Sequence, residues 1–225
     1  ITVNMGVGGI PNVPTCMMQP DFGDDGILLT TPRVGGPACA ASYPRFLSYA
    51  VGSTPMQFSA DLTCLARTGT SGCGFEQQLD AMLKAVLPSS AGMLFYAGTT
   101  GHGDDVATNG GFLRPGSLLV VVLVTDEDDC STDQTDIWNP MSAEHIGDLN
   151  LRCSNYFSQL YPIERYINGL GSLGSETVLL ALTGVPEDLT ASSPSATDYD
   201  RLFADPRMQN TITTVGGTGV LAPTC

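Results

Sequence analysis

Two runs of apolar residues dominate the hydrophobic pattern of this chain. Residues 118–124 read LLVVVLV and residues 177–183 read TVLLALT, so neither run alternates between polar and apolar positions. Continuous apolar runs of this length are typical of strands that are buried on both faces of a parallel sheet. We therefore predict a buried strand at each place. Weaker patterns predict a strand over residues 1–7, where polar and apolar residues alternate, and a short strand over residues 27–31.

The clearest helical pattern covers residues 75–87. Its apolar residues recur at intervals of three and four, which places them on one face of a helix. Asp80 and Lys84 have the i, i+4 spacing of an ion pair on the other face. Pro88 then ends the helix because proline cannot continue the hydrogen-bond pattern. The residues on the apolar face are Phe75, Leu79, Met82, Leu83, Val86 and Leu87.

Other helices are predicted at residues 58–67, with Ser59 as the N-cap, at residues 158–170, and near residues 199–203. Residues 8–44 are rich in Gly, Pro and Asp and predict a long loop region. Because buried strands alternate with amphipathic helices, the fold class that we expect is α/β, with a mainly parallel sheet flanked by helices and with long loops pinned by disulfides.

Composition narrows the classes of function. The chain has 225 residues, 23 acidic against 9 basic, and Lys84 is its only lysine, so the net charge is −14. Nucleic acids and anionic membrane surfaces bind cationic patches, so we expect neither as a partner. No run reaches the roughly 18 apolar residues of a membrane span, and no signal peptide is recognisable. The chain opens on Ile1, which is consistent with a processed or trimmed product.

The cysteines predict disulfides in an oxidising compartment. Seven are spread through the chain without a C-x-x-C pair, and there are only two histidines, so a Cys/His zinc site is not expected. The alternative is a set of buried free thiols in a cytosolic protein. Pairing each cysteine with its neighbour is a hypothesis, because six cysteines allow 15 patterns. It gives Cys16–Cys39, Cys64–Cys73 and Cys130–Cys153, and it leaves Cys225 unpaired or paired outside this chain.

Four consecutive carboxylates, residues 126–129, follow the most apolar strand directly. Packed like charges repel and resist burial, so either a cation offsets the repulsion or the segment lies in water. Ligands of parallel sheets bind outside the carboxyl ends of the strands, which is where Asp126 is predicted to lie. Mg²⁺ and Ca²⁺ prefer such oxygen ligands, and Asp128 and Asp129 are further candidates. The spacing is not that of an EF-hand.

The motifs carry a resemblance to a known family. The segment VVVLVTDEDDCS at 120–131 resembles the strand ending in an acidic loop of von Willebrand factor type A-like domains. The nearest versions bear cysteines and come from secreted proteins and lipoproteins of Gram-negative bacteria, notably myxobacteria. CLARTGTSGCGFEQQLDAMLKA at 64–85 and NGGFLRPGSLLVVVLVTDEDDC at 109–130 resemble two more of their segments, and ITVNMGVGG at 1–9 looks like their second strand. The resemblance implies a single Rossmann-like domain over residues 1–225, incomplete at both ends.

The same resemblance implies a metal-ion-dependent adhesion site. In the family, the ion is held by an Asp-x-Ser-x-Ser motif, a Thr from a second loop and an Asp after a later strand. Asp126 matches the last of these, and Thr70 or Ser71 falls where the second is expected. The Asp-x-Ser-x-Ser motif does not occur in this sequence. The chain is then a fragment, or another chain supplies the missing strand, or the metal site has degenerated.

Three functions remain open from the sequence. The first is an extracellular, non-enzymatic binding, adhesion or assembly module that docks a protein partner or other subunits, including copies of itself, through Mg²⁺ or Ca²⁺. The second is a disulfide-stapled structural subunit without a metal. The third, a hydrolase, would use Ser71, His102 and Asp104, but no G-x-S-x-G elbow is present. The first two predict a secreted, cell-surface or periplasmic location in a Gram-negative bacterium.

Overall fold

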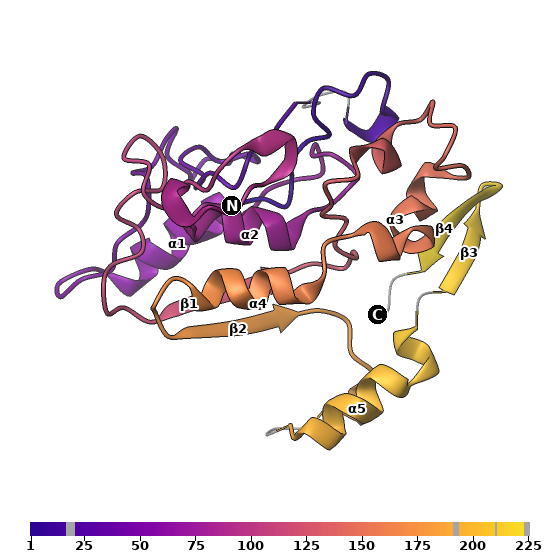
Figure 1. The fold of residues 1–225 in the computed structure, drawn as a ribbon. Coiled ribbons are helices and arrows are strands. Elements are labelled where there is room, and N and C mark those ends of the chain that lie inside the picture. Colours follow the sequence, from indigo (N-terminus) through magenta and orange to yellow (C-terminus); the bar gives the residue numbers. More distant parts are fainter. Residues whose placement is uncertain (17–20, 191–193, 210, 223–225) are drawn as a thin grey trace.

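The computed structural model describes residues 1–16, 21–190, 194–209 and 211–222 and shows a mixed α/β chain (Figure 1). Its α-helices are Pro55–Ala66 (α1), Gln78–Val86 (α2), Arg152–Asn155 (α3), Ile163–Gly171 (α4) and Ala196–Ala204 (α5). Its strands are Leu119–Val124 (β1), Thr177–Leu182 (β2), Thr211–Val215 (β3) and Thr218–Ala222 (β4). Short 3₁₀ helices lie at Pro14–Cys16 (η1), Ser89–Ala91 (η2), Tyr96–Gly98 (η3), Thr135–Trp138 (η4), Leu149–Leu151 (η5), Phe157–Gln159 (η6), Glu187–Leu189 (η7) and Pro206–Met208 (η8).

The two predicted apolar strands pair with each other in parallel. Leu119 lies opposite Thr177 and the register continues to Val124 opposite Leu182. Of the mainly parallel sheet that the sequence predicts, the described residues contain this single pair. The other sheet in this part of the chain is the antiparallel β3–β4 hairpin, in a region where the sequence predicted only turns.

The strands are not buried on both faces, which corrects the prediction. Leu119 is 5% exposed, but Val120 and Val122 are half exposed. Side chains alternate along a strand, and paired residues of a parallel ladder point the same way. The exposed side therefore forms one apolar surface, which we call the outer face. It consists of Val120, Val122 and Val124 of β1 with Val178, Leu180 and Leu182 of β2, each between 41% and 70% exposed.

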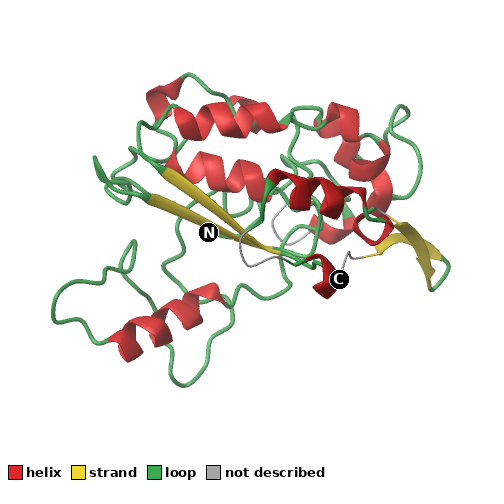
Figure 2. Ribbon diagram, turned by 90° about the horizontal axis from the view of Figure 1, so that it is seen from below, coloured by secondary structure: helices red, strands yellow, loops and turns green. Residues whose placement is uncertain are grey.

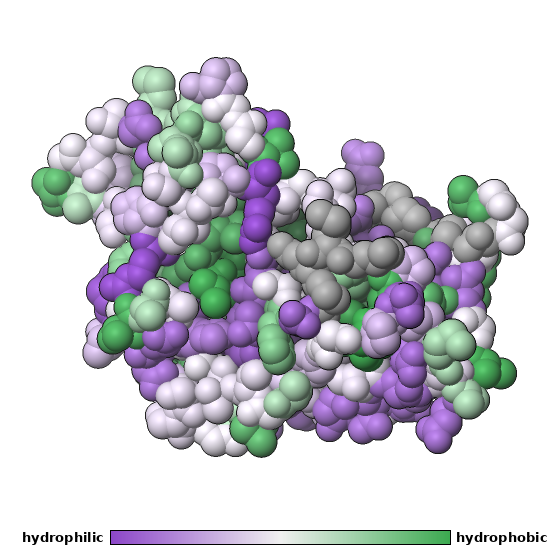
Figure 3. Space-filling model, turned by 90° about the horizontal axis from the view of Figure 1, so that it is seen from above, coloured by the Kyte–Doolittle hydropathy of each residue, from purple (hydrophilic) through white to green (hydrophobic). Residues whose placement is uncertain are grey.

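The inner side of the sheet is covered at β1 but not at β2, where Leu179, the partner of Val121, is 51% exposed. Val121 packs with Leu83 of α2 and Leu170 of α4, next to the buried rings of Phe95 and Tyr166. Seen from below, the strands run over most of their length with no helix in front of them (Figure 2). The strands are half exposed because α2 and α4 both lie on the inner side. The surface seen from above, by contrast, mixes hydrophilic and hydrophobic residues (Figure 3).

Helix α2 is more deeply buried than its pattern predicts. It begins at Gln78 rather than Phe75, and its polar side is enclosed as well as its apolar side. Asp80 is 0% and Lys84 is 1% exposed, and the two do not form the predicted pair with each other. Asp80 instead meets Arg165 of α4, and Lys84 meets Asp25, because loops and α4 pack on the side that periodicity assigned to solvent.

The strands predicted at residues 1–7 and 27–31 are wrong; both segments are loops. The first is turned by Gly6, which has φ +69, and a Cβ on Gly6 would lie 2.1 Å from the Asp21 carbonyl oxygen. Its backbone bonds to loops rather than to a strand, as when Gly8 N–H donates to Asp21 O at 2.8 Å. The buried apolar residues here therefore pack as a loop lining the core.

The remaining helices exist with shifted ends. The helix predicted at 58–67 runs over α1, with Pro55 in its first turn and Thr54 at the N-cap position, so Ser59 lies inside it and is not the cap. The helix predicted at 158–170 is α4, which begins after Pro162. The helix predicted near 199–203 is α5. No described helix is both long and apolar enough to span a bilayer.

The disulfides involve the six cysteines that we expected, but in a different pattern. Cys130–Cys153 is confirmed, whereas the predicted Cys16–Cys39 and Cys64–Cys73 are wrong: the bonds are Cys16–Cys73 and Cys39–Cys64. Neighbours in sequence fail to pair because Cys16, Cys73 and Cys130 converge on one buried cluster around Trp138. The Cys64 side chain at the end of α1 instead meets the loop that carries Cys39. Cys225 lies outside the described residues.

Candidate functional site

The acidic loop after β1 lies against the amino end of α2. The Gln78 side-chain amide donates to the Glu127 carbonyl oxygen at 2.7 Å and to Thr125 Oγ1 at 3.3 Å. The Cys130 N–H donates to the Glu76 carbonyl oxygen at 2.7 Å. These bonds fix the loop to the start of the helix, so the acids are positioned by α2 as well as by β1.

One carboxylate of the acidic run, that of Asp129, is stabilised by hydrogen bonds. It accepts from the Leu79 N–H at 2.8 Å and from the N–H and hydroxyl of Ser131 at 3.0 and 3.1 Å. The amino end of a helix carries partial positive charge and free N–H groups, so a carboxylate is stabilised there. Burial nevertheless raises the pKa of Asp129, against the lowering effect of these bonds. Asp129 therefore serves α2 as a helix cap contributed by a distant segment.

Asp80 lies behind Asp129 and is the most perturbed carboxyl of the region. It is 0% exposed, and burial raises its pKa to about 6 although the Arg165 guanidinium, at 3.2 Å, acts in the opposite direction. Nearby Asp129 raises it further. Its Oδ2 atom has no hydrogen-bond partner among the described residues. The ion pair of Arg165 with Asp80 ties α4 to α2. Arg165 also stacks on Tyr161, with 3.9 Å between the guanidinium carbon and the ring centroid.

The other three acids face water. Asp126, Glu127 and Asp128 are exposed, so most of their mutual repulsion is screened by solvent. Burial, together with nearby Asp126 and Glu127, raises the pKa of Glu76, which shows that these carboxyls share one neighbourhood. No group of three or more His, Cys, Asp or Glu side chains among the described residues is arranged to hold a metal ion. The described carboxyls of the acidic loop therefore do not form a Mg²⁺ or Ca²⁺ site by themselves.

Thr70 and Ser71 are exposed on the loop before Cys73. The contacts described for the acidic loop come from Gln78, Leu79 and Ser131, not from Thr70 or Ser71. The Cys16–Cys73 bond and the Cys73 N–H, which donates to Asn4 Oδ1 at 3.3 Å, hold their loop to the amino-terminal segment. Asp126 and Asp128 thus lie exposed on the loop, Asp129 turns to α2, and the described partners of Asp129 include neither Thr70 nor Ser71.

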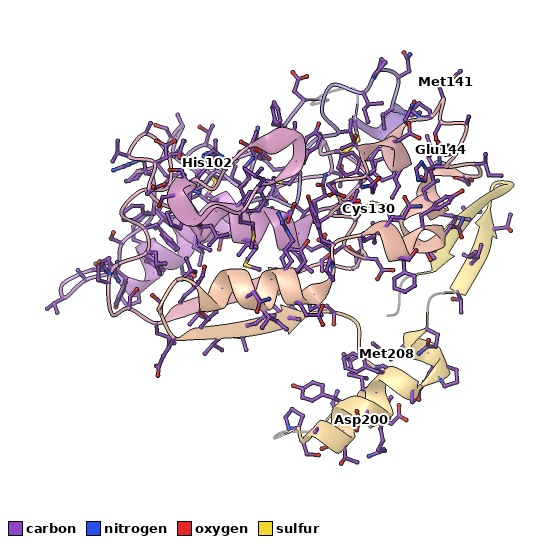
Figure 4. The ribbon with its side chains drawn as sticks, in the orientation of Figure 1. His102, Cys130, Met141, Glu144, Asp200 and Met208 are labelled. Carbon is purple, nitrogen blue, oxygen red and sulfur yellow. A yellow bond between two sulfur atoms is a disulfide. The ribbon has the colours of Figure 1, made fainter. Side chains whose placement is uncertain are left out.

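The residues of the hydrolase hypothesis have other partners. His102 Nε2 lies 2.9 Å from Asp25 Oδ2, and Asp25 also pairs with the buried Lys84. Asp104 accepts from the N–H and the hydroxyl of Ser89 at 2.7 and 3.0 Å. His102 lies among the loops above α2, apart from Cys130 at the end of the acidic loop (Figure 4). These contacts hold loops together and do not align a nucleophile with a base.

Sequence reasoning missed a Ser/His/Asp grouping at His145. Its Nδ1 atom lies 3.0 Å from Asp136 Oδ2 and 3.3 Å from Ser142 Oγ, and its Nε2 lies 2.9 Å from Gln159 Oε1. In a catalytic triad, Ser and Asp occupy different ring nitrogens; here they share one. Burial lowers the pKa of His145, but the bonds with Asp136 and Gln159 outweigh it and raise the pKa. The grouping stabilises the loop that Cys130–Cys153 encloses.

A hollow of about 460 Å³ lies beside the Cys39–Cys64 bond. Its described lining includes Met56, Ala60 and Arg67, and Arg67 is the only ionisable residue among the residues that line it. A lining of this kind offers apolar contact but no acid–base pair or metal ligands.

No family model, no curated protein and no solved structure matches this chain. The resemblance to von Willebrand factor type A-like domains therefore rests on the sequence motifs. The mixed α/β fold and the three described disulfides are compatible with it.

Proposed function

We propose that this protein is an extracellular, non-enzymatic assembly module that binds other protein subunits through the outer face of its parallel strands. The observation that carries the proposal is this exposed surface of six Val and Leu side chains. Parallel strands in proteins are ordinarily covered on both faces. An uncovered apolar surface of this kind marks an interaction site.

The driving force for such binding is apolar burial. Each Å² of apolar surface removed from water contributes about 25 cal/mol. Val122 and Leu180 lie opposite each other at the centre of the outer face, and both are about half exposed. The face carries no charged side chain, so a partner that covers it would not bury an unpaired ion.

The disulfides and the charge support the extracellular location. Three disulfides among the described residues fit an oxidising compartment, outside the cell or in the periplasm. A net charge of −14 keeps such a module soluble while its apolar surface is uncovered. The family resemblance supports the same class, a secreted or cell-surface protein of a Gram-negative bacterium.

A divalent cation is not required by this proposal. The described donors around Asp126 do not form a site by themselves. A cation-dependent form would need further oxygen ligands from a partner, with Asp126 as the ligand that this chain contributes. We therefore propose the metal-free assembly function and treat ion binding as a separate, measurable property.

Sedimentation equilibrium of the full chain tests the proposal. We expect concentration-dependent self-association that is lost in a Val122→Lys, Leu180→Lys double variant. A matched control, Val51→Lys with Val106→Lys, adds the same charges at positions that are 108% and 81% exposed and should associate like the parent. Association that survives in the outer-face variant, or a parent that stays monomeric throughout, would refute the proposed surface.

A further inference from the structure

We propose that α5 is the cover of the outer face: in the free protein it folds back across β1 and β2, and it leaves the face when a partner binds. Coverage of the outer face by α5 is a contact within one chain, whereas its release by a partner rests on the assembly function proposed above. It joins two apolar surfaces that the structure leaves exposed on the same molecule.

Helix α5 has its own apolar stripe. At 100° per residue, Ala196, Tyr199, Leu202 and Phe203 fall within an arc of about 120°. Tyr199 and Phe203 are 48% and 65% exposed, and their rings stack with centroids 6.3 Å apart. No residue of α5 is buried. An exposed aromatic stripe on a well-formed helix indicates that the helix packs against another surface.

The sequence builds α5 as a true helix. Ser195 and Asp198 form a complete capping box, in which each side chain bonds the backbone N–H of the other. Helices shorter than about 12 residues are marginal in water without tertiary packing. Nine residues with a strong cap are therefore expected to persist only against a surface. The neighbouring η7 and η8, which α5 contacts, bury none of its side chains.

The outer face fits α5 in size and position. Six-residue strands are about 20 Å long, and nine helical residues are about 13.5 Å long. Residues 183–195 connect β2 to α5 and span at most about 45 Å. In Figure 1, α5 lies on the uncovered side of the strands, beyond the end of β2. The connection is long enough for the helix to turn back over the strands that precede it.

The charges of α5 suit this arrangement. Asp198, Asp200 and Arg201 lie outside the apolar arc, so they stay in water when the stripe meets the sheet. Asp200 is labelled on α5 in Figure 4. Packing the stripe of Tyr199 and Phe203 on Val122 and Leu180 thus covers both exposed surfaces without burying a charge.

A second copy of the chain is a poorer occupant at low concentration. Two copies each carrying −14 repel each other. A helix on the same chain has an effective concentration of the order of millimolar, with no association entropy to offset. In free protein at micromolar concentration, the intramolecular contact is favoured.

Methyl-based NMR on the full chain tests the proposal directly. We expect nuclear Overhauser contacts between the rings of Tyr199 and Phe203 and the methyl groups of Val122 and Leu180. A sample mixed from two differently labelled preparations separates contacts within a chain from contacts between chains. Contacts seen only between chains would make a second copy the occupant and overturn the proposal. The absence of any contact would overturn it as well.

Dye binding gives a second readout. In a Tyr199→Ser, Phe203→Ser variant the cover is lost, so fluorescence of an apolar-surface dye should rise several-fold. The control Tyr49→Ser, Phe157→Ser removes two rings that are 56% and 73% exposed elsewhere, and it should not raise the signal. Equal signals from both variants would show that α5 does not shield the outer face.

Discussion

Replacing Asp80 with Asn should change the pH dependence of stability more than any other single carboxyl substitution around the acidic loop. Asp80 is fully buried between α2 and α4, and one of its oxygens has no hydrogen-bond partner among the described residues. Burial raises its pKa from an ordinary value of 3.8 to about 6, even with Arg165 beside it. The asparagine cannot ionise, so the variant isolates the contribution of this carboxyl.

The direction in which stability changes with pH follows from proton linkage. Because the pKa is higher in the folded state, the folded protein binds more protons than the unfolded chain between about pH 4 and pH 6, and stability falls as pH rises through this window. A change from 3.8 to about 6 corresponds to about 3 kcal/mol. The free energy of unfolding of Asp80→Asn minus that of the parent should therefore rise by about 3 kcal/mol between pH 4 and pH 7.

Urea unfolding at a series of pH values measures this difference. The same comparison with Asp133→Asn is the control, because it removes an exposed carboxyl from the same loop. A difference between parent and Asp80→Asn that stays constant from pH 4 to pH 7 would show that Asp80 is not held in the buried, partly compensated state that the structure describes.

Three further predictions concern packing, cross-links and ions. Gly169→Ala should lower the free energy of unfolding by about 1–2 kcal/mol, because its Cβ would lie 2.7 Å from the buried Leu83 side chain. Gly171→Ala in the same helix is the control: its Cβ meets open space, so this variant should be neutral or slightly stabilising. Equal effects of the two variants in urea unfolding would contradict the α2–α4 packing. Replacing Cys39 and Cys64 together with Ser should cost about 3.5 kcal/mol, because the bond closes a loop of 25 residues, and non-reducing peptide mapping of the parent should recover this pair. Chelator should leave the melting temperature unchanged, because no cation-binding group is assembled among the described residues; a drop of several degrees on calcium removal would show that ligands from elsewhere complete a site.

The sequence predicted features that depend on local pattern. β1, β2 and the helices α2 and α5 lie where periodicity or continuous apolar runs put them, with ends shifted by a few residues. Burial of the strands was not predictable in this way. The residue pattern of a strand is the same whether its second face packs against a helix or faces water. Coverage of the outer face depends on elements that are remote in the chain.

The site shows the same division. That Asp126 follows the carboxyl end of β1 was predictable, since chain order places it there. The partners of Asp80 and Lys84 were not, because Arg165 is 85 residues and Asp25 is 59 residues away in sequence. The role of Asp129 as a cap on α2 also depends on a contact across 50 residues.

Disulfide pairing failed for a related reason. Nearness in sequence favoured Cys64–Cys73, but Cys73 is drawn into the core beside Cys16 by the packing of Phe75 and Trp138. Cys64, near the end of α1, then bonds to Cys39 in the neighbouring loop.

Sedimentation velocity at one micromolar-range concentration can compare three proteins: the parent, the Tyr199→Ser, Phe203→Ser variant, and that variant with Val122→Lys and Leu180→Lys added. If the outer face is an assembly surface covered by α5, removing the two rings should shift the chain from monomer toward oligomers, and adding the lysines should return it to monomer. Identical monomeric sedimentation of all three proteins, or oligomers that persist after the lysines are added, would show that the outer face is not an assembly surface covered by α5.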